Sequence, residues 1–137
     1  MFRTLDDSIS VFGQIAPEDV AAAKDQGFTT IINNRPENEE PGQPGGAEIE
    51  AAAHEAGLAY VAIPVSPGGF GPAQVQQMAD ALGKAEGPVL AFCRSGTRST
   101  FLWALARHIM GDDGETLIAK AAEAGYDLSP IRPMITA

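Results

Sequence analysis

A short apolar run, Val89–Phe92, leads directly into the polar segment Cys93-Arg94-Ser95-Gly96-Thr97-Arg98-Ser99, and a helical pattern of apolar residues follows from Phe101. The apolar run predicts a buried strand, and the segment after it predicts a tight turn into a helix. In such a unit the N–H groups of the loop and of the first helical turn point at one spot, where the helix dipole adds positive charge. The stretch therefore predicts an anion-binding site.

Cys93 opens this loop and is the only cysteine of the chain. A helix N-terminus and neighbouring arginines both favour the thiolate, which is the nucleophilic form. Arg98 offers a planar fork of donors to an oxyanion or to the thiolate itself. A buried structural cysteine is the alternative, but it has no need of arginines and a glycine at these spacings. We predict Cys93 and Arg98 as catalytic residues, and an anion-binding set of Arg94, Ser95, Gly96, Thr97 and Ser99, with Ser99 capping the helix.

The segment from Phe92 to Ser99 resembles the active-site loop of rhodanese-type sulfurtransferases and the phosphate loop of protein tyrosine and dual-specificity phosphatases. Together with Ile31-Ile32-Asn33-Asn34-Arg35-Pro36, it resembles one small bacterial family over nearly the whole chain. That family is the phosphatase-like domain also found fused to metallo-β-lactamase-type hydrolases, the β-lactamase hydrolase-like proteins. The resemblance implies a three-layer α/β fold, protein-tyrosine-phosphatase-like or rhodanese-like, with Cys93 as nucleophile.

The chain alternates between strand and helix patterns, which predicts a single α/β domain over residues 1–137 with a mostly parallel central sheet flanked by helices. Strands are expected at residues 9–12, 28–33, 58–64 and 89–92, and helices at 17–26, 47–56, 72–84, 99–109 and 115–124. Parallel strands joined by helices end at one edge of a sheet, and ligands bind at that edge. The Cys93 loop therefore shares its edge with the loops that follow the other strands.

Two of those loops hold accessory candidates. The polar segment from Asn34 to Gly46 carries Arg35, and the sequence leaves two roles open for it. Arg35 either faces the Cys93 loop or pairs on the surface with an acid of its own segment, Glu37, Glu39 or Glu40. The segment Val65–Gly71 supplies Ser66 as a second accessory residue and contains no Asp or Glu.

The charge balance limits the partners. Nine basic and eighteen acidic residues give a net charge of −9, which disfavours nucleic acid and anionic membranes. A single cysteine excludes cysteine-rich zinc motifs, and His54 has no second histidine at helical spacing, so we predict no metal and no cofactor. The first residues lack a signal-peptide pattern, and no apolar run approaches about 20 residues, which predicts a cytoplasmic protein.

Three features favour sulfur transfer when they are compared with the families that the chain resembles. Four residues separate Cys93 from Arg98, whereas the phosphatase loops usually have five. Phe92 stands where most tyrosine phosphatases have histidine. Those phosphatases also use an aspartic acid from a mobile loop to protonate the leaving group, a contribution of about 10²–10⁴ in rate, and Val65–Gly71 has no such acid.

We therefore predict a sulfurtransferase that moves sulfane sulfur from thiosulfate or a persulfide, through a Cys93 persulfide, to a small thiol or a protein acceptor. The alternative is a phosphatase in which Cys93 takes the phosphoryl group, Arg98 clamps its oxygens and water hydrolyses the thiophosphate. An acid for the leaving group would then have to come from elsewhere, for instance Glu37, Glu39 or Glu40. A third interpretation is an anion-binding or redox-sensing module in which Cys93 is modified without turnover.

Overall fold

A five-stranded sheet with strand order β1-β2-β5-β3-β4 organises the protein, whose computed structural model describes residues 2–136. The strands are β1 (Arg3–Asp6), β2 (Ile9–Phe12), β3 (Thr30–Asn33), β4 (Ala59–Ala62) and β5 (Val89–Phe92). β1 pairs antiparallel with β2, and the other three pairings are parallel. β5 therefore lies at the centre of the sheet, between β2 and β3.

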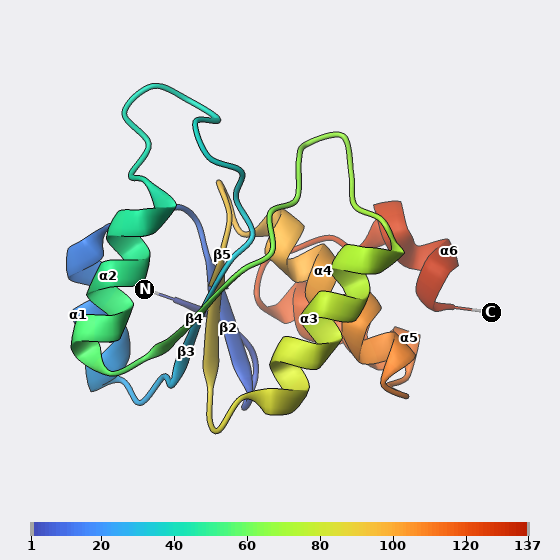
Figure 1. Ribbon diagram of the computed structural model, residues 1–137. Coiled ribbons are helices and arrows are strands. Elements are labelled where there is room, and N and C mark those ends of the chain that lie inside the picture. The colour runs from blue at the N-terminus through green and yellow to red at the C-terminus, as the bar shows by residue number, and fades with distance from the viewer. Residues whose placement is uncertain (1, 137) are drawn as a thin grey trace.

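Helices cover both faces of the sheet and make the three layers visible in Figure 1. The face on the left of that view carries α1 (Pro17–Asp25) and α2 (Gly46–Ala56). The opposite face carries α3 (Pro72–Lys84), α4 (Thr97–Ile109), α5 (Gly114–Glu123) and α6 (Arg132–Ile135), with the short 3-10 helix η1 (Ser129–Ile131) before α6. The predicted three-layer α/β fold with a mostly parallel sheet is confirmed.

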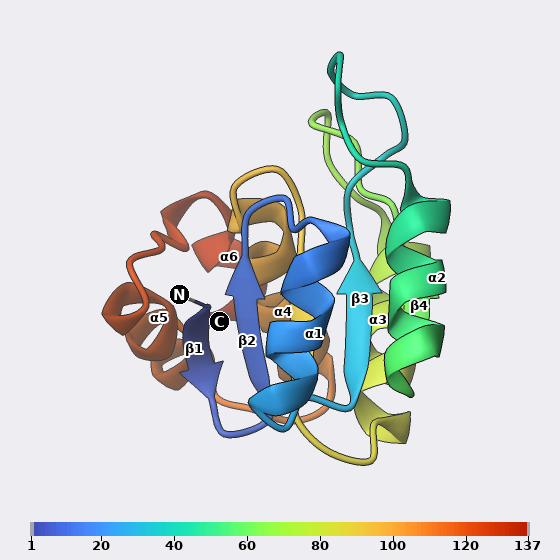
Figure 2. The ribbon, with the colours of Figure 1, turned by 90° about the vertical axis from the view of Figure 1, so that its left-hand side faces the viewer.

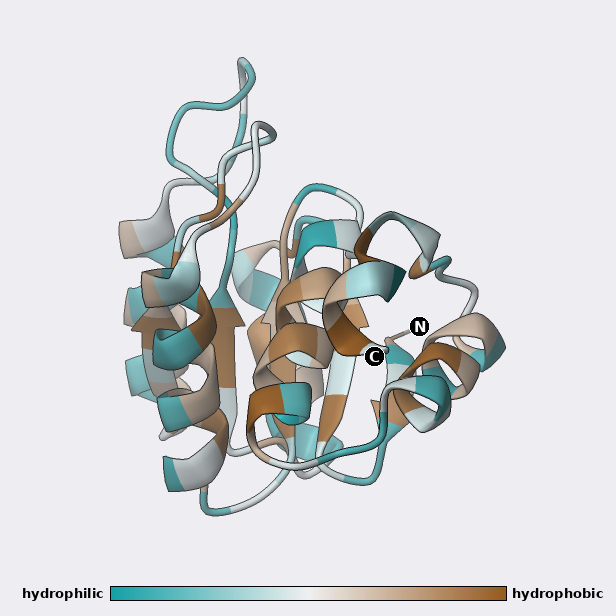
Figure 3. Cartoon of the chain, turned by 90° about the vertical axis from the view of Figure 1, so that its right-hand side faces the viewer, coloured by the Kyte–Doolittle hydropathy of each residue, from teal (hydrophilic) through white to brown (hydrophobic). Residues whose placement is uncertain are grey.

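The central strand supplies both hydrophobic layers because its side chains alternate between the two faces. Leu90 and Phe92 belong to the cluster with α1 and α2, whereas Val89 and Ala91 belong to the cluster with α3 and α4. All four residues are at most 1% exposed. This double burial explains why β5 reads as a continuous apolar run in the sequence. The hydropathy colouring in Figure 3 places the most apolar segments on the strands and the inner helix faces.

The carboxyl ends of the four parallel strands gather their loops at one edge of the sheet. These are residues 13–16 after β2, the polar loop (residues 34–45) after β3, the β4–α3 loop (residues 63–71) and the Cys93 loop (residues 93–96) after β5. The polar loop and the β4–α3 loop rise side by side above the sheet (Figures 1 and 2). The prediction that these loops share one edge of the sheet is therefore confirmed.

Two regions differ from the sequence-based expectation. β1 is not predicted because only Leu5 of its four residues is buried, so it shows no strand pattern. The segment after α5, for which the sequence predicts no regular element, contributes Leu128, Ile131 and Ile135 to the larger hydrophobic cluster. Within residues 2–136, every helix is too short or too polar to span a bilayer.

The central position of β5 yields a stability prediction. Leu90→Ala should lower the free energy of unfolding by about 2–5 kcal/mol, because it leaves a cavity at a fully buried site. The matched control Ile109→Ala, at a residue that is 55% exposed, should cost less than about 0.5 kcal/mol. Urea denaturation of both variants measures the difference, and equal losses would contradict this account of the core.

Candidate active site

The Cys93 loop lies directly against the loop that follows β2. The Cys93 N–H donates to the Phe12 carbonyl at 3.4 Å, and the Gln14 N–H donates to the Arg94 carbonyl at 3.3 Å. A Cβ atom on Gly13 would lie 2.9 Å from that same carbonyl, so this close approach of two backbones requires glycine. The end of β5 and the loop after β2 thus hold the Cys93 loop in position.

The sulfur of Cys93 sits at the N-terminus of α4. Gly96 has a φ of +93° and precedes the helix, and its N–H donates to the Cys93 Sγ at 3.0 Å. Cys93 is 0% exposed. The loop therefore curls around the sulfur with an N–H group directed at it, and the partial positive charge of the helix end lies on the same side. This arrangement favours the binding of an anion beside the sulfur.

Arg98 is held in place by both neighbouring loops. Its Nη1 and Nη2 donate to the two carboxylate oxygens of Glu39, each at 2.8 Å, and Nη1 also donates to the Val65 carbonyl at 2.6 Å. The Glu39 side chain comes from the polar loop and is 12% exposed. Two parallel charge-assisted bonds fix both the position and the plane of the guanidinium group. Arg98 is thus locked at the site by a residue 59 positions away.

Arg35 combines the two roles that the sequence left open. It pairs with acids of its own loop, Glu39 through Nε at 2.8 Å and Glu40 through Nη2 at 2.9 Å, and Nη1 donates to Gln14 at 3.1 Å. Yet Arg35 is only 2% exposed, so its guanidinium is buried even where it pairs with the partly exposed Glu40. Because Glu39 also binds Arg98, Arg35 reaches the site through a shared carboxylate.

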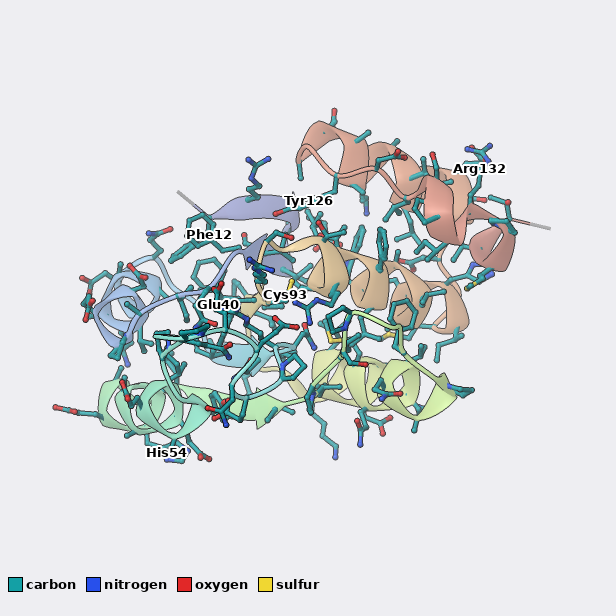
Figure 4. All side chains as sticks on the ribbon, turned by 90° about the horizontal axis from the view of Figure 1, so that it is seen from above. Phe12, Glu40, His54, Cys93, Tyr126 and Arg132 are labelled. Atoms are coloured by element: carbon teal, nitrogen blue, oxygen red, sulfur yellow. The ribbon has the colours of Figure 1, made fainter. Side chains whose placement is uncertain are left out.

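Glu40 extends the ion-pair network to the surface. Its second oxygen lies 3.3 Å from Nη2 of Arg94, whose side chain is 63% exposed. In the view from above, Glu40 and Cys93 are seen close to each other in projection (Figure 4). Three arginines and two glutamates therefore form one network over the Cys93 loop: Arg35, Arg94, Arg98, Glu39 and Glu40.

The network keeps its glutamates ionised. The hydrogen bond from Arg98, opposed in part by burial and reinforced by Arg35, lowers the pKa of Glu39 to about 2. The hydrogen bond from Arg35 and the charge of Arg94 lower the pKa of Glu40. Neither carboxyl group carries a proton at neutral pH in this arrangement. The polar loop thus brings acids to the site, but in a form that accepts protons and does not donate them.

Three residues of the predicted anion-binding set, Ser95, Thr97 and Ser99, do not all lie where the sequence predicts. The expectation that Ser99 caps the helix is wrong: Gly96 is the N-cap residue and α4 begins at Thr97, so Ser99 is buried inside the first turn. Its hydroxyl oxygen is buried without a hydrogen-bond partner among residues 2–136. The early start follows from the left-handed turn at Gly96. Ser95 and Thr97 bond to each other through their hydroxyl groups at 3.1 Å.

Ser66 lies in the exposed part of the β4–α3 loop, where it forms an isolated bridge with Gly69. The contact of this loop with the site is made by the Val65 carbonyl on Arg98. Sequence reasoning missed this carbonyl because a backbone group leaves no trace in residue identity. Among residues 2–136, no three His, Cys, Asp or Glu side chains are grouped in a way that could hold a metal ion.

Sequence reasoning also missed Tyr126. Its hydroxyl donates to the Ser95 carbonyl in the Cys93 loop at 3.1 Å, although the two residues are 31 positions apart. The nearest signal in the sequence is Gly125, which ends the last long helix.

Solved structures identify the class of fold. A candidate phosphatase from Neisseria meningitidis Z2491 superposes with a TM-score of 0.83 at 33% identity, over 96% of this chain and 94% of that one. The structure of PTPMT1 superposes with a TM-score of 0.73 at 14% identity, over 98% of this chain and 96% of that one. The protein therefore has a protein-tyrosine-phosphatase-like α/β fold.

Sequence comparison identifies the family. Residues 1–110 match the family described as "Beta-lactamase hydrolase-like protein, phosphatase-like domain". A beta-lactamase hydrolase-like protein of Agrobacterium fabrum is 38% identical over 107 residues, which are 78% of this chain and 25% of that protein. The chain belongs to this phosphatase-like family, as its resemblance implied, and it spans about a quarter of the length of that curated relative.

The Glu39 network yields a pH-dependent prediction. Because the pKa of Glu39 is lowered from 4.5 to about 2, its ionisation stabilises the fold above pH 4.5, and this contribution is lost as the pH falls toward 2. Glu39→Gln should therefore lower the free energy of unfolding by roughly 1.5–3 kcal/mol at pH 7, the range for hydrogen bonds to charged groups.

The difference between wild type and Glu39→Gln should shrink as the pH falls from 5 to 3, because wild-type Glu39 then loses its advantage. Urea denaturation at a series of pH values from 5 to 3 measures this difference in the free energy of unfolding. Glu55→Gln, at an exposed position on α2, is the matched control and should change little at any pH. A gap between wild type and Glu39→Gln that stays constant down to pH 3 would contradict the assignment.

Proposed function

We propose that this domain is a phosphatase that hydrolyses phosphate esters through a Cys93 thiophosphate intermediate. The observation that carries the proposal is the Cys93 Sγ, enclosed by its loop and bonded to the Gly96 N–H, at the start of the helix that carries Arg98. A nucleophilic sulfur, inward N–H donors and a fixed guanidinium are the groups that an attack on phosphorus requires. Membership of the phosphatase-like family supports the same reading.

The bonding of Arg98 leaves one edge of its guanidinium for an oxyanion. A guanidinium has five N–H donors. Glu39 accepts one N–H from Nη1 and one from Nη2, and the Val65 carbonyl accepts the second N–H of Nη1. The Nε–H and the other N–H of Nη2 remain, and these two are parallel on one edge. We assign this edge to two oxygens of the phosphoryl group, while Glu39 occupies the adjacent edge formed by Nη1 and Nη2.

The reaction then needs two displacements. In the first, the Cys93 thiolate attacks phosphorus, an S–P bond forms, the P–O ester bond breaks, and the leaving oxygen takes a proton from water. In the second, water attacks phosphorus and loses a proton, the S–P bond breaks, and phosphate and thiolate are released. The N–H groups of the loop and Arg98 stabilise the charge on the transferring oxygens in both steps. Ser99, whose buried hydroxyl lies in the first turn of α4, is a candidate donor to the sulfur as it leaves.

Substrate entry requires movement over the loop, because Cys93 has no exposed surface. The group best able to move is the Arg94 side chain, which is 63% exposed and contacts Glu40 at 3.3 Å, and Glu40 is itself 42% exposed. Arg35, Glu39 and Arg98 are joined by several short bonds and stay in place. We therefore propose that the ester enters past Arg94 and Glu40, and that Arg94 then pairs with the incoming anion.

We prefer phosphate ester hydrolysis to sulfur transfer, although the sequence features alone favour sulfur transfer. The features that favoured sulfur transfer were the short loop, Phe92 in place of histidine, and the missing acid. The family match and the Neisseria meningitidis structure both point to phosphatases, and neither supports a rhodanese-type reaction. Small anionic phosphate esters are accordingly the proposed substrates. The protein as a whole carries a net charge of −9, so the arginines and N–H groups at the site must attract these anions locally.

A direct test is the hydrolysis of an aryl phosphate beside thiosulfate-to-cyanide sulfur transfer, with intact mass measured during turnover. We expect aryl phosphate turnover that Cys93→Ser abolishes, and a transient adduct of one phosphoryl group on the wild-type chain. A persulfide adduct with thiosulfate and no phosphate release would overturn the proposal in favour of sulfur transfer. The absence of both activities would favour a sensing or anion-binding module.

Arg98 provides a prediction about geometry. Arg98→Lys should lower kcat/KM for the aryl phosphate by at least about 100-fold, because a point charge cannot hold Glu39 and two phosphoryl oxygens at once. The matched control is Arg107→Lys on α4, where the arginine forms a two-bond pair with Asp112 at 2.9 and 3.2 Å. That control should keep kcat/KM within about twofold, and similar losses in both variants would argue against a specific role for Arg98.

The ionised state of the glutamates predicts a steep dependence on the leaving group. Without a proton donor, esters of acidic phenols should be cleaved far faster than alkyl phosphates such as phosphoserine. The measurement is kcat/KM, which reports the first displacement, for a series of aryl phosphates of graded phenol acidity, together with one alkyl phosphate. A flat series with rapid turnover of the alkyl phosphate would mean that Glu39 or Glu40 leaves its arginine and acts as an acid.

A further inference from the structure

The hydrogen bonds of one peptide group connect Tyr126 to Cys93. The Ser95 carbonyl and the Gly96 N–H are the two ends of the same peptide unit. The carbonyl accepts a hydrogen bond from the Tyr126 hydroxyl at 3.1 Å, and the N–H donates to the Cys93 Sγ at 3.0 Å. In a trans peptide these groups point in opposite directions. The phenol and the sulfur therefore lie at opposite edges of one peptide group and are joined through it.

We propose that Tyr126 is a positioning residue of the active site: its hydroxyl orients and polarises the Ser95–Gly96 peptide group, whose N–H holds the Cys93 thiolate. A carbonyl that accepts a strong hydrogen bond makes the N–H of the same peptide a better donor, because the bonds of a chain polarise one another. A carbonyl oxygen can only accept, so the phenol must be the donor in this contact. The inference rests on the proposed function only in assigning Cys93 a thiolate role.

The fold places Tyr126 with little freedom. Tyr126 follows Gly125, which has a φ of +96° just past the end of α5. The Tyr126 N–H donates to the Ala121 carbonyl at 2.9 Å and the Gly125 N–H donates to the Ala122 carbonyl at 3.0 Å. This pair of bonds is the Schellman ending of a helix. The glycine stop of α5 therefore aims the next residue at the Cys93 loop, as the view in Figure 4 illustrates.

Contacts with the ring and with Gly96 complete the arrangement. The guanidinium of Arg3 in β1 lies 5.5 Å from the centroid of the Tyr126 ring, within range of a cation–π interaction, and donates to the Ala124 carbonyl at 2.9 Å. A Cβ atom at Gly96 would collide with the Tyr126 hydroxyl oxygen. The absence of a side chain at residue 96 thus admits the phenol to the loop, and this is a second reason for glycine at that position beside its positive φ.

The ionisation of Tyr126 is compatible with this role. Burial raises the pKa of Tyr126, Arg3 opposes that effect, and the negative charge of Cys93 adds to it. The phenol consequently keeps its proton over the pH range in which a thiolate operates. The charged and titratable groups around the peptide group are Arg3 against the ring, Cys93, and the arginines beside it with their paired acids, Arg94, Arg98, Glu39 and Glu40.

The test is the pH dependence of Cys93 alkylation by iodoacetamide, which reports the thiolate and needs no substrate. Tyr126→Phe removes one oxygen atom and keeps the ring. The midpoint of its alkylation profile should move up by about half a pH unit to one unit, the effect of one hydrogen bond on the thiolate. Aryl phosphate kcat/KM should fall about three- to tenfold below that midpoint and recover above it.

Tyr60→Phe is the matched control. Tyr60 is also partly buried, and its hydroxyl accepts a hydrogen bond from Asn33 at 2.9 Å, away from the sulfur. This variant should leave the alkylation midpoint unchanged. A Tyr126→Phe profile that coincides with wild type overturns the proposal, whether or not thermal stability falls, because a purely structural role moves stability alone.

Replacement of Tyr126 by 3-fluorotyrosine keeps the oxygen and strengthens it as a donor, so the inference is testable even if Tyr126→Phe does not fold. The midpoint should then move down by a few tenths of a pH unit, and an upward or absent shift overturns the proposal. Because alkylation is read without any ester, a domain that fails to hydrolyse phosphate can still confirm or overturn the role of Tyr126.

Discussion

The carboxylate of Glu39, shared between Arg35 and Arg98, is the interaction on which the site depends. It joins the loop after β3 to the first turn of the helix after β5, and it fixes the plane of the guanidinium that we assign to the substrate. Its two arginine partners also hold it ionised. The same contact that organises the site therefore removes Glu39 as an acid, and the chemistry must rely on stabilising charge rather than on donating a proton.

The sheet makes that contact feasible. Parallel pairing of β5 with β2 and β3 brings three loops to one edge, and double burial of β5 leaves its end no freedom to shift. Gly13 permits the backbone of one loop to touch the next, and Gly96 turns the chain into α4. The result is a sulfur enclosed on several sides by elements that belong to the core. The active-site geometry is therefore a property of the packing and not of the loop sequence alone.

Much of this could be predicted from the sequence, and the rest had identifiable reasons to be missed. The apolar run before Cys93, the glycine and arginine spacing after it, and the helix stops are local signals, and they gave the parallel sheet, the loop and the helix. The start of α4 was placed two residues late because a left-handed glycine reads as an ordinary turn residue. Glu39 was among the acids that the sequence offered, but its bond to Arg98 is set by a tertiary contact. The contacts of Val65 and Tyr126 run through backbone carbonyls, so residue patterns hold no record of them.

The elements after α4, which are α5, η1 and α6, belong to the hydrophobic core of the domain. The family match covers residues 1–110, yet Leu117, Leu128, Ile131 and Ile135 belong to the same apolar cluster as the strands. Arg3 and Asp6 of β1 contact Ala124 and Lys120, so the first strand and the segment after α5 brace each other. A fragment cut at residue 110 would expose one side of α4 and leave β1 without its support. In a longer protein that carries this domain, a boundary drawn after α4 would divide one hydrophobic cluster between two fragments.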